Sequence, residues 1–463
     1  MSATRRLGSP AVAAAPEAGA FPIRRLDLGS NDPATAEIRR RLVRRGAVPD
    51  PSVRAGARAI LDDVDRRGDD AVREASTRFG GGLANGDLVI DKATLRAAGD
   101  RLRPPVRRAL GQAIGNVRRF AETQRPVSTT TTIATGIEIE RRWTPLRRVG
   151  CYVPGGSAPY PSSLVMTVVP AQVAGVREIV VASPADRGGR LNEVLLGAAG
   201  LLEVEALVVA GGAQAIGALA YGLPWAGVAP VDRIVGPGNA WVTAAKIEVS
   251  ALVGIDLPAG PSEGMVLVDS TADPEIVAAD LVTQAEHGPD SPAILVTTDT
   301  TMADAVEAAV GRLLPTLERR DVIETALAGH GWIAIAPDLD TAIGFVNDYA
   351  PEHLSVDVAD VEAAVSRIES AGSLFVGRWA PESAGDYATG ANHVLPTGGL
   401  ARSCGPLAVE TFGRFTQVQR ITSRGLAGIR GTIGVLATEE GLTAHRNAVE
   451  TRFASPDVAG PDR

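Results

Sequence analysis

The stretch EALVVAGGAQAIGALAYG, residues 205–222, carries the pattern that decides the fold. A short apolar run leads into two glycines, and a longer segment of small and apolar residues follows them. This order predicts a buried strand, a glycine-rich turn and a helix. REIVVASP (177–184) before it and DRIVGPGNAWVTAAKIEV (232–249) after it continue the same alternation. Repeated units of this kind predict a parallel sheet that is covered by helices.

A second block of the same kind begins after residue 260. Its predicted strands are GMVLVDS (264–270), PAILVTT (292–298), GWIAIAP (331–337), EHLSVDV (352–358) and GSLFVG (372–377). Helical segments separate most of them, so we expect two doubly wound, incomplete Rossmann-like α/β domains with parallel sheets.

The remaining segments complete the predicted organisation. Residues 52–123 have mainly helical spacing, and residues 129–147 look rich in strand. We assign 22–150 and 260–405 to a first, catalytic α/β domain and 151–259 to a second. Residues 406–455 show helical patterns and no clear strand, which predicts a helical arm. Residues 1–21 and 456–463 are predicted to be disordered or flexible tails.

Composition excludes several classes of protein. The net charge of −8 and the pI near 5.4 argue against a nucleic-acid-binding protein, which favours basic patches. The sequence contains no run of about 18 apolar residues, so no membrane span is predicted. The two cysteines, Cys151 and Cys404, are too few for a disulfide framework, and we expect reduced thiols in a cytoplasmic protein.

The five histidines of the chain suggest a functional site. In TQAEHGPDS (283–291), Gln284 and His287 lie three residues apart on a predicted helix that begins at Asp273-Pro274 and ends before Gly288-Pro289. Their side chains share a face, so they are either metal ligands or a hydrogen-bonded surface pair. Imidazole suits zinc, whereas an amide oxygen is an unusual ligand.

Three further histidines lie near carboxylates or in loops of small residues. His353 follows Glu352 where a turn enters a strand, His393 lies in a glycine-rich loop, and His445 is in a predicted helix; His330 looks incidental. A phosphate-binding fingerprint of the G-x-G-x-x-G type is absent from the sequence. Gly211-Gly212-Ala213-Gln214 nevertheless opens a predicted helix after a strand, which suits an anion or is an ordinary turn.

From about Ile60 to Phe453 the chain resembles the L-histidinol dehydrogenase family. The resemblance rests on the order and combination of CYVPGGSAPYPSS (151–163), GGAQAIGALAYG (211–222), GPGNAWVTAAK (236–246), PAGPSE (258–263), QAEHGPDS (284–291), APEHL (350–354), PESAGDYATGANHVLPT (381–397) and TAHRNAV (443–449). It implies a zinc-dependent, NAD-linked dehydrogenase, a homodimer with one zinc per subunit, that oxidises L-histidinol through bound L-histidinal to L-histidine, the last step of histidine biosynthesis.

The resemblance also implies roles for individual residues. His353 would be the general base, and Glu352 would activate the water that hydrates the aldehyde. The implied zinc ligands are Gln284, His287, Asp386 and His445. The implied NAD contacts are Tyr152, Gln214 and Asn239. The implied substrate contacts are Ser262, Gln284, His287, His353, Asp386, His393, Glu440 and His445. The partner subunit would supply His445 and Glu440.

Other functions remain open at this stage. A relative that oxidises another small polar alcohol would keep the cofactor loops and lose the residues that bind imidazole. A zinc hydrolase would use Glu352 to activate a metal-bound water, although no H-E-x-x-H motif is present. A non-catalytic zinc-binding protein would leave the glycine-rich loops unexplained.

Overall fold

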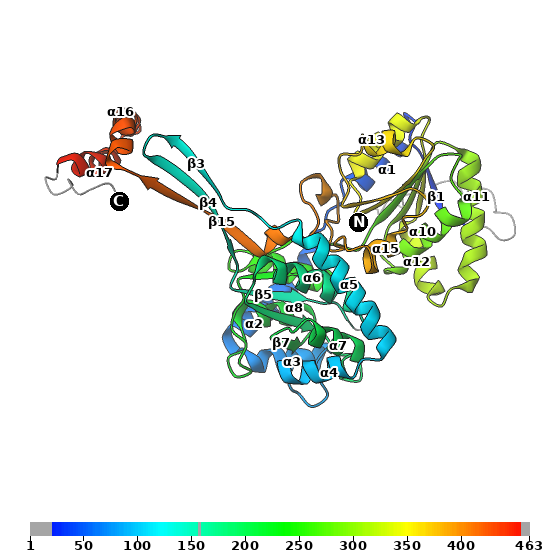
Figure 1. The fold of residues 1–463 in the computed structure, drawn as a ribbon. Helices are drawn as coiled ribbons and strands as arrows, with labels where there is room; N and C mark the ends of the chain where they lie inside the picture. Colours follow the sequence, from blue (N-terminus) through cyan, green and yellow to red (C-terminus); the bar gives the residue numbers. More distant parts are fainter. Residues whose placement is uncertain (1–20, 156–158, 455–463) are drawn as a thin grey trace, which may run out of the picture.

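The computed structural model describes residues 21–155 and 159–454. These residues form two α/β lobes and an arm that projects away from them (Figure 1). The predicted tails lie outside the described residues, apart from Phe21. None of the described helices is long and apolar enough to cross a membrane.

The first lobe is built on a sheet of parallel strands in the order β1-β12-β11-β10-β13-β14. Their bounds are Arg24–Asp27, Trp332–Ile335, Ala293–Thr297, Gly264–Val268, His353–Asp357 and Ser373–Val376. One core lies between this sheet and helices α10 (Pro274–Glu286), α11 (Thr300–Leu313) and α12 (Arg320–His330). A second core lies under α1 (Pro33–Val43), α13 (Leu339–Tyr349) and α14 (Val361–Val365) on the other face.

The second lobe has the sheet order β2-β7-β6-β5-β8-β9, in which β2 alone runs antiparallel to its neighbour. Its strands are Val89–Asp91, Ala206–Val209, Glu178–Ser183, Arg148–Tyr152, Arg233–Val235 and Gly254–Ile255. One face carries α4 (Lys92–Asp100), α5 (Pro104–Glu122), α6 (Pro161–Ala174) and α7 (Glu193–Leu201). The other carries α2 (Pro51–Arg67), α3 (Asp69–Phe79), α8 (Gly212–Tyr221) and α9 (Ala240–Val249). The prediction of two doubly wound α/β units is therefore confirmed.

The division of the chain between the two lobes differs from the expected boundaries. The expected first domain includes all of residues 22–150. In the structure only β1 and α1 of that range form part of the first lobe, whereas helices α2 to α5 and strand β2 pack in the second lobe. Helical periodicity shows which face of α2 is apolar, but the choice of partner depends on the shape of that face. Here Leu61 and Val64 of α2 pack beside α8 and α9.

The arm combines a sheet with two helices. Strands β3 (Thr129–Ala134), β4 (Ile137–Pro145) and β15 (Gly413–Ile421) form an antiparallel sheet, followed by α16 (Ser423–Glu439) and α17 (Thr443–Ala454). The expectation of no strand after residue 406 was wrong. Most residues of β15 are polar and exposed, so the strand lacks the apolar alternation that marks a half-buried strand.

Candidate functional site

The C-terminal end of α10 carries the first part of the site. Asp273 caps the start of the helix, with its Oδ1 accepting a hydrogen bond from the Glu275 N–H at 3.0 Å. The apolar face of α10 is buried against the sheet, and His287 is the C-cap residue. The predicted helix and its ends are confirmed, and they hold Gln284 and His287 beside the start of β10.

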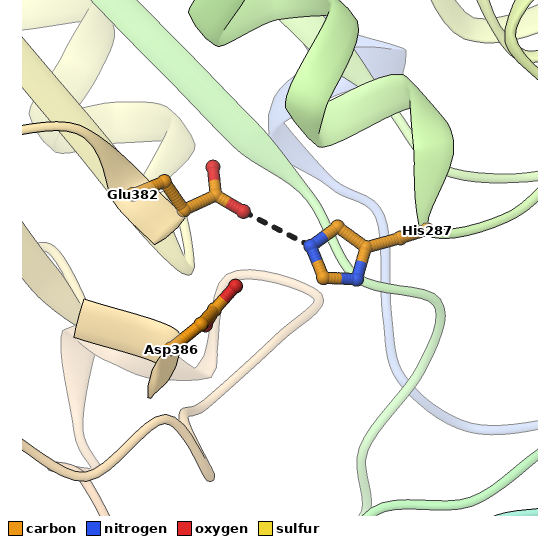
Figure 2. A group of neighbouring side chains, drawn as sticks. All are labelled: His287, Glu382 and Asp386. Carbon is orange, nitrogen blue, oxygen red and sulfur yellow. Dashed lines mark hydrogen bonds and ion pairs between the residues drawn. The ribbon is translucent and has the colours of Figure 1, made fainter. Parts of the chain in front are cut away.

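Two carboxylates face His287 from α15 (Glu382–Tyr387). Glu382 Oε1 lies 3.0 Å from His287 Nε2, and Asp386 follows one helical turn after Glu382. Figure 2 shows both carboxylates on the same side of the His287 ring. One ligand atom from each of the three residues lies within 4.8 Å of the others. An imidazole nitrogen and two carboxylate oxygens at this spacing can hold a divalent cation.

The buried amide of Gln284 also indicates a cation site. Its side chain is buried, and its Oε1 has no hydrogen-bond partner among the described residues. Its Nε2 donates a long hydrogen bond of 3.4 Å to Ser262 Oγ. A Cβ on Gly264 would stand 2.6 Å from Gln284 Oε1, so glycine is needed there for the amide to fit against β10. A buried acceptor without a donor is costly, and a cation would satisfy it.

The Glu352-His353 pair lies where β13 begins. His353 is 4% exposed, and neither ring nitrogen has a hydrogen-bond partner among the described residues. Its Nδ1 lies 3.6 Å from Glu382 Oε1 and 3.8 Å from Glu352 Oε2. The His353 and His287 rings lie nearly parallel, with centroids 6.1 Å apart. The free imidazole therefore stands beside the candidate cation site.

Burial shifts the titration of these groups in opposite directions. It lowers the pKa of His353 and raises the pKa of Glu352 well above its ordinary value. Burial also acts against the charged form of His287, but the hydrogen bond and charge of Glu382 overcome it and raise the His287 pKa to about 9. Burial raises the pKa of Asp386 to about 6. Neighbouring acids and bases whose pKa values are shifted in opposite directions are typical of catalytic sites.

His393 connects this site to the second lobe. Its Nδ1 lies 3.1 Å from the Asp386 carbonyl oxygen, and its Nε2 lies 3.2 Å from Ser163 Oγ on α6. Burial lowers the His393 pKa to about 4, so the ring is neutral near pH 7. The neighbouring Asn392 donates from Nδ2 to the Met166 carbonyl at 2.8 Å. The loop around His393 is therefore fixed against α6.

A separate cavity of about 770 Å³ lies at the carboxyl ends of β5, β6 and β7. Tyr152, Gln214 and Asn239, the three expected cofactor contacts, all line it. Gly211 caps α8 without a side-chain hydrogen bond, which leaves the first N–H groups of that helix available to an anion. Asn239 also has a structural role, because its Oδ1 accepts hydrogen bonds from the first turn of α9.

Comparison with known proteins identifies the family. The family model for histidinol dehydrogenase matches residues 43–453. The chain is 45% identical over 435 residues to histidinol dehydrogenase of Nocardia farcinica, which covers 93% of this chain and 97% of the relative. It is 46% identical over 403 residues to the Halobacterium salinarum enzyme of the same name, covering 87% and 93%. The chain belongs to the histidinol dehydrogenase family.

The crystal structure of histidinol dehydrogenase from Elizabethkingia anophelis has the same fold. It superposes with a TM-score of 0.85 at 34% identity, covering 93% of this chain and 98% of the other. The two-lobed arrangement with its projecting arm is therefore the fold of a histidinol dehydrogenase.

The structure brings together most of the residues that the sequence predicted. One cluster contains Ser262, Gln284, His287, Glu352, His353, Asp386 and His393. Glu440 and His445 are exposed, at the C-cap of α16 and in α17. Figure 1 places these two helices at the end of the arm, far from α10 and α15 of the same chain.

Sequence reasoning missed Glu382. This carboxylate contacts His287 and faces His353, and its side chain is almost completely buried. A usable signal was present, because Glu382 and Asp386 are four residues apart in PESAGDY and therefore share a helical face. The proline before Glu382 would also have marked the start of this short helix.

Proposed function

We propose that this protein is a cytoplasmic, NAD-dependent and zinc-dependent enzyme of histidine biosynthesis that oxidises L-histidinol to L-histidine through bound L-histidinal. The observation that carries the proposal is the buried Glu352-His353 pair, which lies beside a cation-type cluster in a chain of the histidinol dehydrogenase family. Two successive oxidations need proton acceptors: a neutral imidazole is one, and a raised pKa makes the ionised form of a carboxyl group a stronger base.

The residues present fit both non-protein groups. The free Gln284 oxygen and the His287-Glu382-Asp386 cluster fit zinc, and the cavity with the uncapped end of α8 fits a dinucleotide. When bound, zinc would supply a Lewis acid that positions the substrate, and NAD would supply the hydride acceptor for each oxidation. Tyr152, Gln214 and Asn239 would contact NAD, and Gln284, His287, Asp386 and the partner's His445 would hold the metal.

His353 serves the first oxidation. Its pKa is lowered by burial, so the ring is uncharged near neutral pH and one nitrogen can take the proton of the alcohol hydroxyl. The carbinol carbon loses a hydride in the same step, and the product is the aldehyde. The fixed position of the ring at the start of β13 keeps the acceptor nitrogen in place.

Glu352 serves the second oxidation. Its carboxylate takes a proton from the water that adds to the aldehyde, and the resulting hydrate loses the second hydride to become the carboxylate product. Ser262 and His393 line the same cluster and would contact the substrate. Glu440 of the partner subunit would supply a carboxylate for the substrate's imidazole or ammonium group.

The defining experiment measures NADH formed per L-histidinol. The protein is stripped with a chelator and assayed before and after zinc is restored. We expect two NADH per histidinol consumed, with activity only after zinc is restored. Absence of NADH with every divalent metal tested would refute the substrate assignment, and turnover without NAD would favour the zinc-hydrolase alternative.

The shared site has its own test. His287→Ala and His445→Ala are each expected to be inactive as pure dimers. After unfolding and refolding together, about half of the dimers are mixed and each mixed dimer has one complete site, which restores about a quarter of wild-type activity. Failure of the mixture to gain activity, with mixed dimers demonstrated by tagged chains, would contradict a site built from two subunits.

A further inference from the structure

Glu263 contacts both proposed catalytic groups through its backbone. Its N–H donates to Glu352 Oε2 at 3.0 Å, and its carbonyl oxygen accepts from the His353 N–H at 3.2 Å. The position of this one peptide segment therefore sets the positions of the Glu352 carboxylate and of the start of β13.

The Glu263 side chain is held by Arg45, which follows α1. Glu263 is 3% exposed, and the Arg45 side chain is 16% exposed. Arg45 Nε donates to Glu263 Oε2 at 2.6 Å, and Arg45 Nη2 donates to Oε1. Two parallel hydrogen bonds of this kind fix the carboxylate in direction as well as in distance.

The same guanidinium also holds the chain that leads into the catalytic pair. Arg45 Nη1 donates to the Tyr349 carbonyl at 2.6 Å, and Nη2 donates to the Ala350 carbonyl at 3.3 Å. Ala350 has a φ of +53°, a left-handed conformation that is uncommon for a residue with a side chain. Arg45 therefore binds both segments whose relative position places Glu352 and His353.

A third segment converges on the same carboxylate. The Gly398 N–H donates to Glu263 Oε1 at 3.1 Å, five residues after His393. Gly398 has a φ of +64°, and a Cβ there would stand 2.6 Å from the Ala47 nitrogen, just beyond Arg45. The Arg45-Glu263 pair is therefore the point at which the N-terminal segment meets three loops of the site.

We propose that Arg45 and Glu263 are positioning residues that keep Glu352 and His353 in register for both oxidations. The inference rests on the proposed function of that pair. Neither side chain belongs to the cation cluster or the cofactor cavity. A displacement of about 1 Å at a reacting group can cost about 100-fold in rate, so loss of this pair affects turnover more than binding.

The test compares Arg45→Lys and Arg45→Met with Arg39→Met. Arg39 is a matched control, because it lies on α1 and pairs with Asp348, the residue before Tyr349, at 2.9 Å in an exposed ion pair. We expect kcat with histidinol to fall about tenfold in Arg45→Lys and about 100-fold in Arg45→Met. The KM values for histidinol and NAD, and the zinc content, stay close to those of the wild type. Arg39→Met keeps wild-type kcat.

Glu263→Gln tests the pair itself. We expect the same loss of kcat as in Arg45→Met, and no further loss when the two changes are combined, because each change breaks the ion pair that holds the other contacts of both side chains in place. Losses that multiply in the double variant would show that the two residues act independently and would overturn the proposed unit.

Hydrogen exchange of the peptide 350–357 gives a readout without turnover. We expect faster exchange in Arg45→Met and wild-type exchange in Arg39→Met. Wild-type kcat and exchange in Arg45→Lys and Arg45→Met, or equal losses in Arg39→Met, would overturn the inference. If the wild-type protein does not oxidise histidinol, the proposed function fails, and the exchange data still decide whether Arg45 holds this segment.

Discussion

Lys246 shows how a buried charge is used away from the catalytic cluster. The residue is 1% exposed, and its ammonium pairs with Asp256 while donating to the Gly236 carbonyl at 3.0 Å. Asp256 Oδ2 accepts from the Gly236 N–H at 2.7 Å. Both charges thus hold the loop that leads to Asn239 in the cofactor cavity.

Removing one member of this pair leaves the other charge buried alone. Lys246→Met is therefore expected to lower the free energy of unfolding by about 3–5 kcal/mol, measured by urea denaturation. Lys92→Met is the control, since Lys92 pairs with Glu205 in an exposed pair and should cost less than about 1 kcal/mol. Equal losses in the two variants would contradict a structural role for the buried pair.

Glu352 and His353 are expected to separate the two oxidations. Glu352→Gln should slow NADH formation from histidinal more than the first hydride transfer from histidinol, whereas His353→Asn should slow the first transfer. Loss of a positioned base costs about 10²- to 10⁴-fold. Single-turnover assays with each substrate measure the two steps, and identical effects on both steps in both variants would argue against separate roles.

Among the elements, α10 carries a further titratable group. Burial, together with the charges of Glu382 and Asp357, raises the pKa of Asp280 to about 6. Because the pKa is raised in the folded state, the contribution of this group to stability is fully present below about pH 4, the unfolded pKa, and is lost as the pH rises through about 6. The folded protein therefore carries a destabilising charge at pH 8.

Replacing this carboxylate should relieve that penalty. Asp280→Asn is expected to raise the free energy of unfolding of the metal-free protein by about 1–2 kcal/mol at pH 8, and by less at pH 5. Urea denaturation at both pH values measures the difference. Asp321→Asn, an exposed change on α12, serves as the control. A gain that does not depend on pH would show that charge burial at Asp280 is not its cause.

The elements themselves followed well from the sequence, because apolar runs and helical spacing reflect burial directly. The strand runs at 264–270, 292–298 and 331–337 became β10, β11 and β12. Strand β15 was not predicted, because it is held mainly by backbone hydrogen bonds to β4, and these leave no pattern in the side chains.

The residues of the site also differ in whether the sequence could predict them. Residues within recognisable motifs, such as His353, were predicted through a family resemblance, and the structure clusters seven of them. Glu382 required its helix to be seen next to His287, and Arg45 required four distant segments to be folded together. Contacts between segments far apart in sequence leave no local pattern, so Arg45 could not be chosen in advance. The spacing of Glu382 and Asp386 indicated a shared helical face, but not that this face meets His287.

At the scale of the whole molecule, the arm has little support from the lobes. Val435 and Leu436 on α16 are 63% and 57% exposed in the single chain. Ending the chain after Thr422 is therefore expected to leave the melting temperature of the two lobes within about 4 °C of the full chain. The same deletion should abolish histidinol oxidation and yield monomers by light scattering. His445→Ala, which should lose activity and keep the dimer, is the control, and an active truncated chain would refute the role of the arm.

The place of β1 at the edge of the first sheet determines when that sheet can be completed during synthesis. β1 pairs with β12, which is made about 300 residues later, whereas every strand of the second sheet has emerged by Ile255. The strands of the second sheet can thus pair while the ribosome is still translating, with the N-terminal segment still unpaired. Pairing between segments so far apart in sequence is slow, and chaperones can bind the unpaired β1 until it pairs with β12.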